Sequence, residues 1–166
     1  MSWHHSRWLV GGLFTGVLAG LALTPPVARA QSQEQIPAKV MDALKARFPK
    51  PEIHKWTREK EGDVVLYDIE FQQEGRKFEA DIREDGVIDN WERQIAAADL
   101  PEAVTKAVQT KYPKSTMKEI MAVTAVKNGQ DVLEGYEVVL QTAEKKDVEV
   151  TVAPDGKILE EGGGEG

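Results

Sequence analysis

The chain of 166 residues contains no cysteine, and this absence excludes several kinds of protein at once. Without a thiol there is no disulfide framework, no cysteine nucleophile, no lipoprotein anchor and no thiolate site for zinc or an iron–sulfur cluster. Aromatic residues make up only 7% of the chain, and Asp plus Glu outnumber Lys plus Arg by 28 to 21. Because nucleic-acid binding needs a basic surface, this balance argues against a nucleic-acid partner.

Motifs for catalysis are missing as well. The sequence contains no Gly-x-Ser-x-Gly, no His-Glu-x-x-His and no phosphate-binding loop. After residue 30, His54 is the single histidine, and Ser32 and Ser115 are the only serines. Neither serine has a candidate general base. We therefore expect no enzymatic activity, no cofactor and no metal site.

Residues 1–30 are predicted to be a cleaved signal peptide. A polar head containing Arg7 precedes an uncharged run from Trp8 to Leu23, which is followed by two prolines and by Ala28-Arg29-Ala30. Small residues at this spacing suit signal peptidase, and the run is short and Gly-rich for a membrane span. An uncleaved anchor is the alternative. Cleavage after Ala30 predicts a periplasmic or secreted protein of 136 residues with a formal charge of −9 and no stable membrane span.

The rest of the chain is predicted to be a tandem repeat. A Phe-Pro-Lys sequence and a Tyr-Pro-Lys sequence lie 64 residues apart, and two Asp-Gly turns lie 70 residues apart. Such internal similarity indicates a repeated structural unit. The two copies are predicted to span residues 31–95 and 100–161, with a linker at 96–99 and a disordered tail at 162–166.

Each copy is predicted to form one helix packed on a four-stranded antiparallel sheet, so the predicted fold class is α+β. Apolar residues follow a helical spacing from Ile36 to Phe48 and again from Leu100 to Tyr112. Proline at positions 49 and 113 ends each helix. The first strand of each sheet is expected at residues 53–60 and 117–126.

Hairpin turns determine the predicted strand register. A turn at Glu74-Gly75 places three apolar pairs on one face of the first sheet, namely Phe71–Phe78, Ile69–Ala80 and Tyr67–Ile82. A longer turn at residues 143–145 does the same in the second sheet for Leu140–Val148, Val138–Val150 and Tyr136–Val152. These apolar faces are expected to pack under the helices.

The opposite face of the first sheet carries an unfavourable arrangement of charge. The same register places Glu70 opposite Glu79 and Asp68 opposite Asp81, and like charges directly opposite each other destabilise a sheet. One interpretation is a mixed, solvated outer face, whose nearby basic residues relieve the repulsion diagonally. The other is a carboxylate patch that binds a basic protein surface, or that binds a divalent cation weakly.

Two tryptophans are further candidates for partner binding. A last turn of three residues in the first copy places Trp91 on the outer face near Glu79, and Trp56 lies in the expected first strand. Exposed Trp beside charged residues is typical of protein interfaces. Alternatively, either ring closes the core between the two copies.

The helices ending in Phe/Tyr-Pro-Lys, the Tyr-x-Val/Ile strands and the Asp-Gly turns resemble the PepSY and PepSY-like domains of secreted bacterial proteins. Leu100-Pro101-Glu102-Ala103-Val104 and Pro154-Asp155-Gly156-Lys157-Ile158-Leu159 carry this resemblance best. The tandem layout is similar to that of beta-lactamase inhibitor proteins, although this chain lacks their disulfide-closed loops. The resemblance implies a non-enzymatic module with a protein partner in the cell envelope or outside the cell, where it restrains a peptidase or other hydrolase. The alternative is a weak divalent-cation or small-ligand sensor of the envelope.

Overall fold

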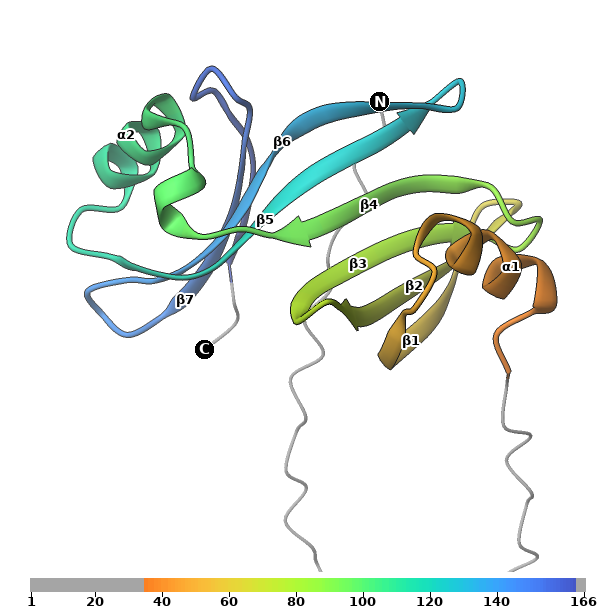
Figure 1. Ribbon diagram of the computed structural model, residues 1–166. Coiled ribbons are helices and arrows are strands. Elements are labelled where there is room, and N and C mark those ends of the chain that lie inside the picture. Colours follow the sequence, from red (N-terminus) through yellow and green to blue (C-terminus); the bar gives the residue numbers. More distant parts are fainter. Residues whose placement is uncertain (1–34, 164–166) are drawn as a thin grey trace, which may run out of the picture. The chain divides into compact units, whose positions relative to one another are not determined.

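The computed structural model describes residues 35–163, which form two α-helices, a short 3-10 helix and eight β-strands (Figure 1). The helices are α1 (Ala38–Arg47), η1 (Ala97–Asp99) and α2 (Glu102–Lys111). The strands are β1 (Glu52–Glu61), β2 (Val64–Gln73), β3 (Arg76–Arg83), β4 (Ile88–Gln94), β5 (Thr116–Lys127), β6 (Gln130–Gln141), β7 (Asp147–Val152) and β8 (Ile158–Gly163). The predicted signal peptide lies outside the described residues. None of the helices in the described part is long and apolar enough to cross a membrane.

The eight strands form one continuous antiparallel sheet, in which strands adjacent in the sequence are adjacent in space. The predicted fold class is therefore wrong, because the molecule is mostly β with two short helices and does not contain two separate four-stranded sheets. The two halves are joined by the pairing of β4 with β5, which runs from Asn90 opposite Ala125 to Gln94 opposite Met121. Because α2 lies between β4 and β5 in the sequence, the two strands are not joined by a hairpin turn from which their pairing could be predicted.

The predicted registers of the two hairpins are confirmed. Phe71 lies opposite Phe78 in β2–β3, and Leu140 lies opposite Val148 in β6–β7. The other four predicted pairs are also present. The β2–β3 turn closes because Glu74 and Gly75 adopt positive φ angles of 53° and 74°. Two such residues give a turn whose twist matches that of the flanking strands.

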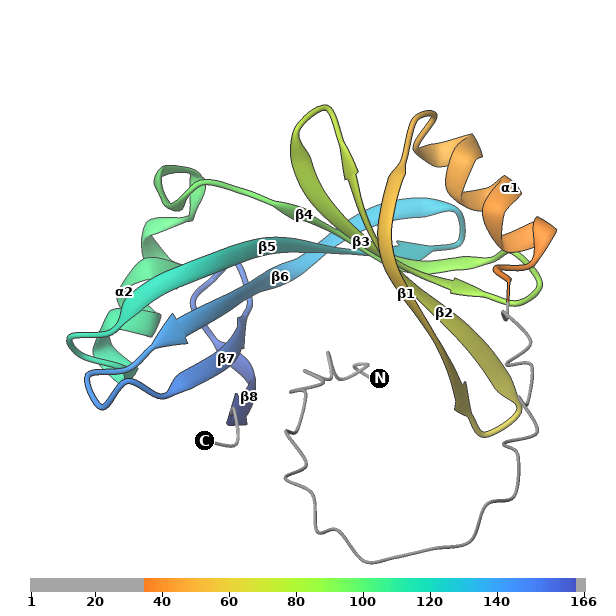
Figure 2. The ribbon, with the colours of Figure 1, turned by 90° about the horizontal axis from the view of Figure 1, so that it is seen from below.

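Both helices cover the same face of the sheet, which we call the covered face. Val40 and Leu44 of α1 pack on β2 and β3, and α2 packs in the same way on β5, β6 and β7. The strand register shows that the two clusters share one face. Arg93, on the covered face of β4, lies opposite Ala122, which belongs to the cluster beneath α2. Figures 1 and 2 show the two helices at opposite ends of the sheet. The other face, which we call the open face, carries no helix of the described residues.

Candidate functional site

Carboxylates of three neighbouring strands lie together on the open face. Glu70 of β2 lies opposite Glu79 of β3, and Glu79 in turn lies opposite Glu92 of β4. In the adjacent row, Asp68 lies opposite Asp81. We call these five residues the acidic cluster. Because alternate residues of a strand point to opposite faces, the register that pairs apolar residues in the core also sets these acids against one another.

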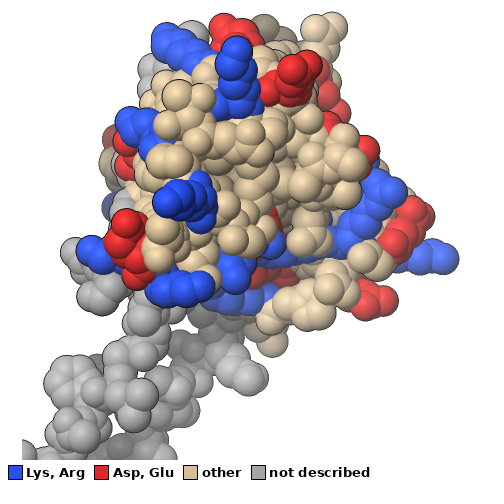
Figure 3. Space-filling view, turned by 90° about the vertical axis from the view of Figure 1, so that its left-hand side faces the viewer, with Lys and Arg blue, Asp and Glu red and all other residues tan. Residues whose placement is uncertain are grey.

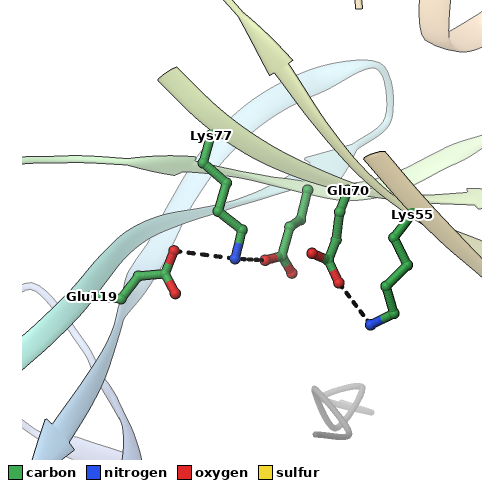
Figure 4. A network of polar contacts seen from close by, with 5 residues as sticks. Lys55, Glu70, Lys77 and Glu119 are labelled. Atoms are coloured by element: carbon green, nitrogen blue, oxygen red, sulfur yellow. Dashed lines mark hydrogen bonds and ion pairs between the residues drawn. The ribbon is translucent and has the colours of Figure 1, made fainter. Parts of the chain in front are cut away.

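Two lysines balance part of this charge (Figure 4). Lys77 Nζ lies 2.7 Å from Glu79 Oε1 and 3.1 Å from Glu119 Oε1, so one ammonium group links β3 to β5 across β4. Lys55 Nζ lies 2.9 Å from Glu70 Oε1. Although burial by itself lowers the pKa of Lys77, the hydrogen bonds and charges of Glu79 and Glu119 raise that pKa above its ordinary value. Lys77 therefore stays charged.

Glu92 is the member of the acidic cluster that sequence reasoning missed. Within the described part of the chain, its Oε2 atom is buried and has no hydrogen-bond partner. Burial, followed by the negative charges of Glu137 and Glu79, raises the pKa of Glu92 well above its usual range. Both effects disfavour the charged form of this carboxyl group.

Aliphatic side chains of β5 account for the burial of Glu92. Val123 lies opposite Glu92, and Met121 and Ala125 precede and follow it on the same face of the strand. All three side chains are at most 8% exposed, yet they belong to neither helix cluster. Apolar neighbours on the same face disfavour the charged form of a carboxyl group.

Asp68 also titrates far from its usual range. Burial, followed by the charges of Asp81, Glu79 and Glu70, raises the pKa of Asp68 to about 7. The neighbouring Asp81 Oδ2 accepts a hydrogen bond of 2.9 Å from Asn90 Nδ2. The charge of the acidic cluster therefore changes near neutral pH, and a bound cation would favour the charged form.

The structure places both tryptophans on the covered face, away from the acidic cluster. Trp56 lies opposite Ile69, and Trp91 lies opposite Ala80. Both rings are half-buried and pack against the cluster beneath α1. The guanidinium carbon of Arg47 lies 4.9 Å from the centre of the Trp91 ring. The predicted carboxylates are thus brought together, whereas the predicted tryptophans are not among them.

The outward position predicted for Trp91 is wrong because β4 contains a bulge. Ile82 pairs with Ile88, but the preceding Asp81 pairs with Asn90, so β4 has one extra residue at this point. The extra residue turns Trp91 onto the covered face and the residue after it onto the open face. A bulge leaves no mark in the apolar pattern, so Glu92 could not be found from sequence alternation.

The side of the molecule drawn in Figure 3 has a different distribution of charge. On the side of the molecule shown in Figure 3, Lys and Arg are interspersed with Asp and Glu around an uncharged area. Among the described residues, no three Asp, Glu or His side chains are arranged to hold a metal ion. The concentration of carboxylates on the open face of β2, β3 and β4 is therefore the feature that calls for a functional explanation.

Comparisons with known proteins give this geometry a family context. The model of the family described as "Putative beta-lactamase-inhibitor-like, PepSY-like" matches residues 28–89 and 65–160. No curated protein matches the chain at a significant level.

Several solved structures share the fold. A DUF2874 family protein from Bacteroides uniformis is 17% identical with a TM-score of 0.58, and the match covers 76% of this chain and 88% of that one. A BLIP-like protein from Bacteroides fragilis is 19% identical with a TM-score of 0.53, over 79% and 89% of the two chains. A protein from Bacteroides eggerthii, described as a "putative periplasmic" protein, is 16% identical with a TM-score of 0.58, over 78% and 90%. At these identities the likeness concerns the fold alone.

Proposed function

The chain belongs to the PepSY-like, beta-lactamase-inhibitor-like family, and from this premise we propose that it is an exported, non-catalytic binding module. Its open face binds a basic surface of a partner protein in the periplasm or outside the cell. The partner is a peptidase or another hydrolase, which the module restrains. The description of the Bacteroides eggerthii structure as periplasmic supports export.

The observation that carries this proposal is the Oε2 atom of Glu92, at the β4 end of the row that Glu70 and Glu79 begin, which has no hydrogen-bond partner among the described residues. A buried acceptor without a partner costs on the order of 1–3 kcal/mol, and like charges across a sheet add to that cost. The guanidinium or ammonium group of a partner would satisfy the acceptor and neutralise the row. An arrangement that is unfavourable in the free protein and is relieved by a cation supports a binding surface for a basic partner.

A catalytic role has less support. His54 lies exposed on β1, whereas Ser115 Oγ donates a hydrogen bond of 2.7 Å to the backbone carbonyl of Tyr112. Among the described residues no hydrogen bond joins a serine to this histidine, and nucleophilic catalysis by serine needs an adjacent base.

A divalent-cation sensor is the alternative, and it too has less support. Lys77 already occupies the space between Glu79 and Glu119, where its ammonium group contacts both carboxylates. A calcium titration followed by thermal unfolding distinguishes the two functions. A rise in Tm that requires calcium and disappears in the variant Glu70→Gln/Glu79→Gln would favour the sensor.

The proposal is tested with a partner captured from the native periplasm and then titrated in pure form. We expect Glu70→Gln/Glu79→Gln to weaken its affinity at least about tenfold, and added salt to weaken the wild-type complex. The control variant Asp42→Asn/Glu144→Gln removes the same charge from exposed positions outside the acidic cluster and should bind normally. The partner's hydrolytic rate should fall as the module is added. An affinity that survives the first double change, or an undiminished rate, would contradict the proposal.

A further inference from the structure

A recess of 520 Å³ lies on the covered face, between the regions that α1 and α2 cover. Sites for small ligands typically measure about 300–1,000 Å³. Its lining includes two arginines, one acid and several apolar side chains, namely Arg76, Arg93, Asp99, Ala122, Leu133 and Tyr136. Nothing in the proposed function uses this recess, because the acidic cluster lies on the opposite face.

The strand register explains why the recess exists. Arg93 lies between Phe78 and Ala122, and Ala122 lies between Arg93 and Tyr136. A small alanine is thus flanked by two long side chains, which leaves a depression in the sheet surface. The helices do not fill the depression, since they lie at opposite ends of the sheet (Figure 2). η1, which follows β4, contributes Asp99 to the lining.

The two arginines of the recess form no ion pair within the described part of the chain. Neither the Arg76 nor the Arg93 side chain has an ion-pair or hydrogen-bond partner there, whereas Arg83 pairs with Asp89 at 2.8 Å. Asp99 lines the same recess but forms no ion pair with either arginine. The chain has 28 acidic and 21 basic residues, so acidic partners for arginine are plentiful. An excess of basic residues therefore does not explain why two arginines in one recess form no ion pair.

We propose that this recess binds a small zwitterion, namely a free apolar amino acid or a short apolar peptide. The planar guanidinium groups of Arg76 and Arg93 match the geometry of a carboxylate, which they contact through paired N–H donors. Asp99 attracts the ligand's ammonium group, and Leu133 and Tyr136 provide apolar contact for its side chain. A dianion such as phosphate fits less well because Asp99 would repel it.

Titrations of the isotope-labelled full chain, followed by NMR, test the chemistry of the ligand. We expect leucine at millimolar concentration to shift the amide signals of Arg93, Ala122 and Tyr136. Leucinamide, which lacks the carboxylate, should bind at least about tenfold more weakly, since hydrogen bonds between charged groups are lost. Inorganic phosphate should not compete. Equal binding of leucine and leucinamide, competition by phosphate, or no shift with leucine would overturn the proposal.

Substitutions test whether the charged residues of the recess bind the ligand. Arg93→Gln and Arg76→Gln should each weaken leucine binding about tenfold, and Arg76 is exposed, so its replacement leaves the fold intact. Arg83→Gln is the matched control, because Arg83 is also an arginine but lies outside the recess. Asp99→Asn should weaken the binding of leucine but not of N-acetyl-leucine, which has no ammonium group. Leucine binding that survives both arginine changes, or that falls equally in Arg83→Gln, would contradict the assignment.

Discussion

The two faces of the β2–β3 hairpin share one register and have opposite energetics. On the covered face the Phe71 and Phe78 rings stack with centroids 5.5 Å apart. On the open face the same pairing sets Glu70 against Glu79. Since side chains alternate along a strand, the register that is best for the core dictates the unfavourable arrangement outside. The acidic cluster therefore lowers the stability of the fold, and packing on the covered face offsets this cost.

The largest effect is expected from a substitution that removes apolar packing on the covered face. Phe71 is fully buried, and its ring lies 4.8 Å from that of Phe48, so Phe71→Ala leaves a cavity beneath α1. We expect the free energy of unfolding to fall by about 3–5 kcal/mol in urea titrations. If the loss were below about 1 kcal/mol, the covered face would not be what holds this register.

The second prediction concerns the pH dependence of stability, which arises from the open face. Folding raises the pKa of Asp68 from 3.8 to about 7, so the native state binds this proton more tightly than the unfolded state. This contribution to stability is fully present below about pH 4 and is lost as the pH rises through 7. Between pH 5 and pH 8 the free energy of unfolding should fall by about 2–3 kcal/mol.

Urea titrations across this pH range provide the measurement. Asp68→Asn should flatten the profile, and Glu92→Gln should flatten it further, because the pKa of Glu92 is also raised. Phe71→Ala should displace the profile without changing its slope, since it lies on the other face. A wild-type stability that increases from pH 5 to pH 8 is incompatible with this account.

A smaller effect is expected when the repulsion on the open face is increased. Lys77→Met removes the ammonium group that Glu79 and Glu119 share, and should cost about 1–2 kcal/mol at pH 8. The control is Lys55→Met, since the Lys55 side chain is 51% exposed against 29% for Lys77 and should cost less than about 0.5 kcal/mol. Equal costs in thermal unfolding would mean that burial of the cluster does not strengthen its charges.

The smallest effect concerns the contact between the halves on the covered face. Arg47 of α1 pairs with Asp131 of β6 and lies over the Trp91 ring. Arg47→Gln should lower the free energy of unfolding by about 0.5–1 kcal/mol. Lys45→Gln, at an exposed position of the same helix, should change it by less than half as much. A larger loss in the control variant would show that helix charge, rather than this contact, determines the result.

The hairpins could be predicted from the sequence because their information is local. A Glu-Gly turn at positions 74 and 75, flanked by alternating apolar residues, leaves one register in which every apolar pair shares a face. The opposition of Glu70 to Glu79, and of Asp68 to Asp81, followed from that register without further information. Four of the five members of the acidic cluster were therefore accessible to sequence reasoning.

The rest depended on features that the local pattern does not contain. The pairing of β4 with β5 joins segments on either side of α2, so no turn type or spacing specifies it. The bulge in β4 adds one residue and exchanges the faces of Trp91 and Glu92. Simple alternation therefore assigned Trp91 to the surface and overlooked Glu92, whose Oε2 atom is buried.

The β4–β5 pairing also affects how strongly the protein resists aggregation at high concentration. In two separate sheets β5 would be an edge strand, and its uncharged run from Ile120 to Val126 would be free to pair with other chains and aggregate. In the continuous sheet β5 is hydrogen-bonded on both sides, and the edges of the described sheet are β1 and β8. β1 presents Lys55, Arg58 and Lys60 there, and such charges oppose edge-to-edge association. The strand most prone to aggregation is thus hidden at the centre.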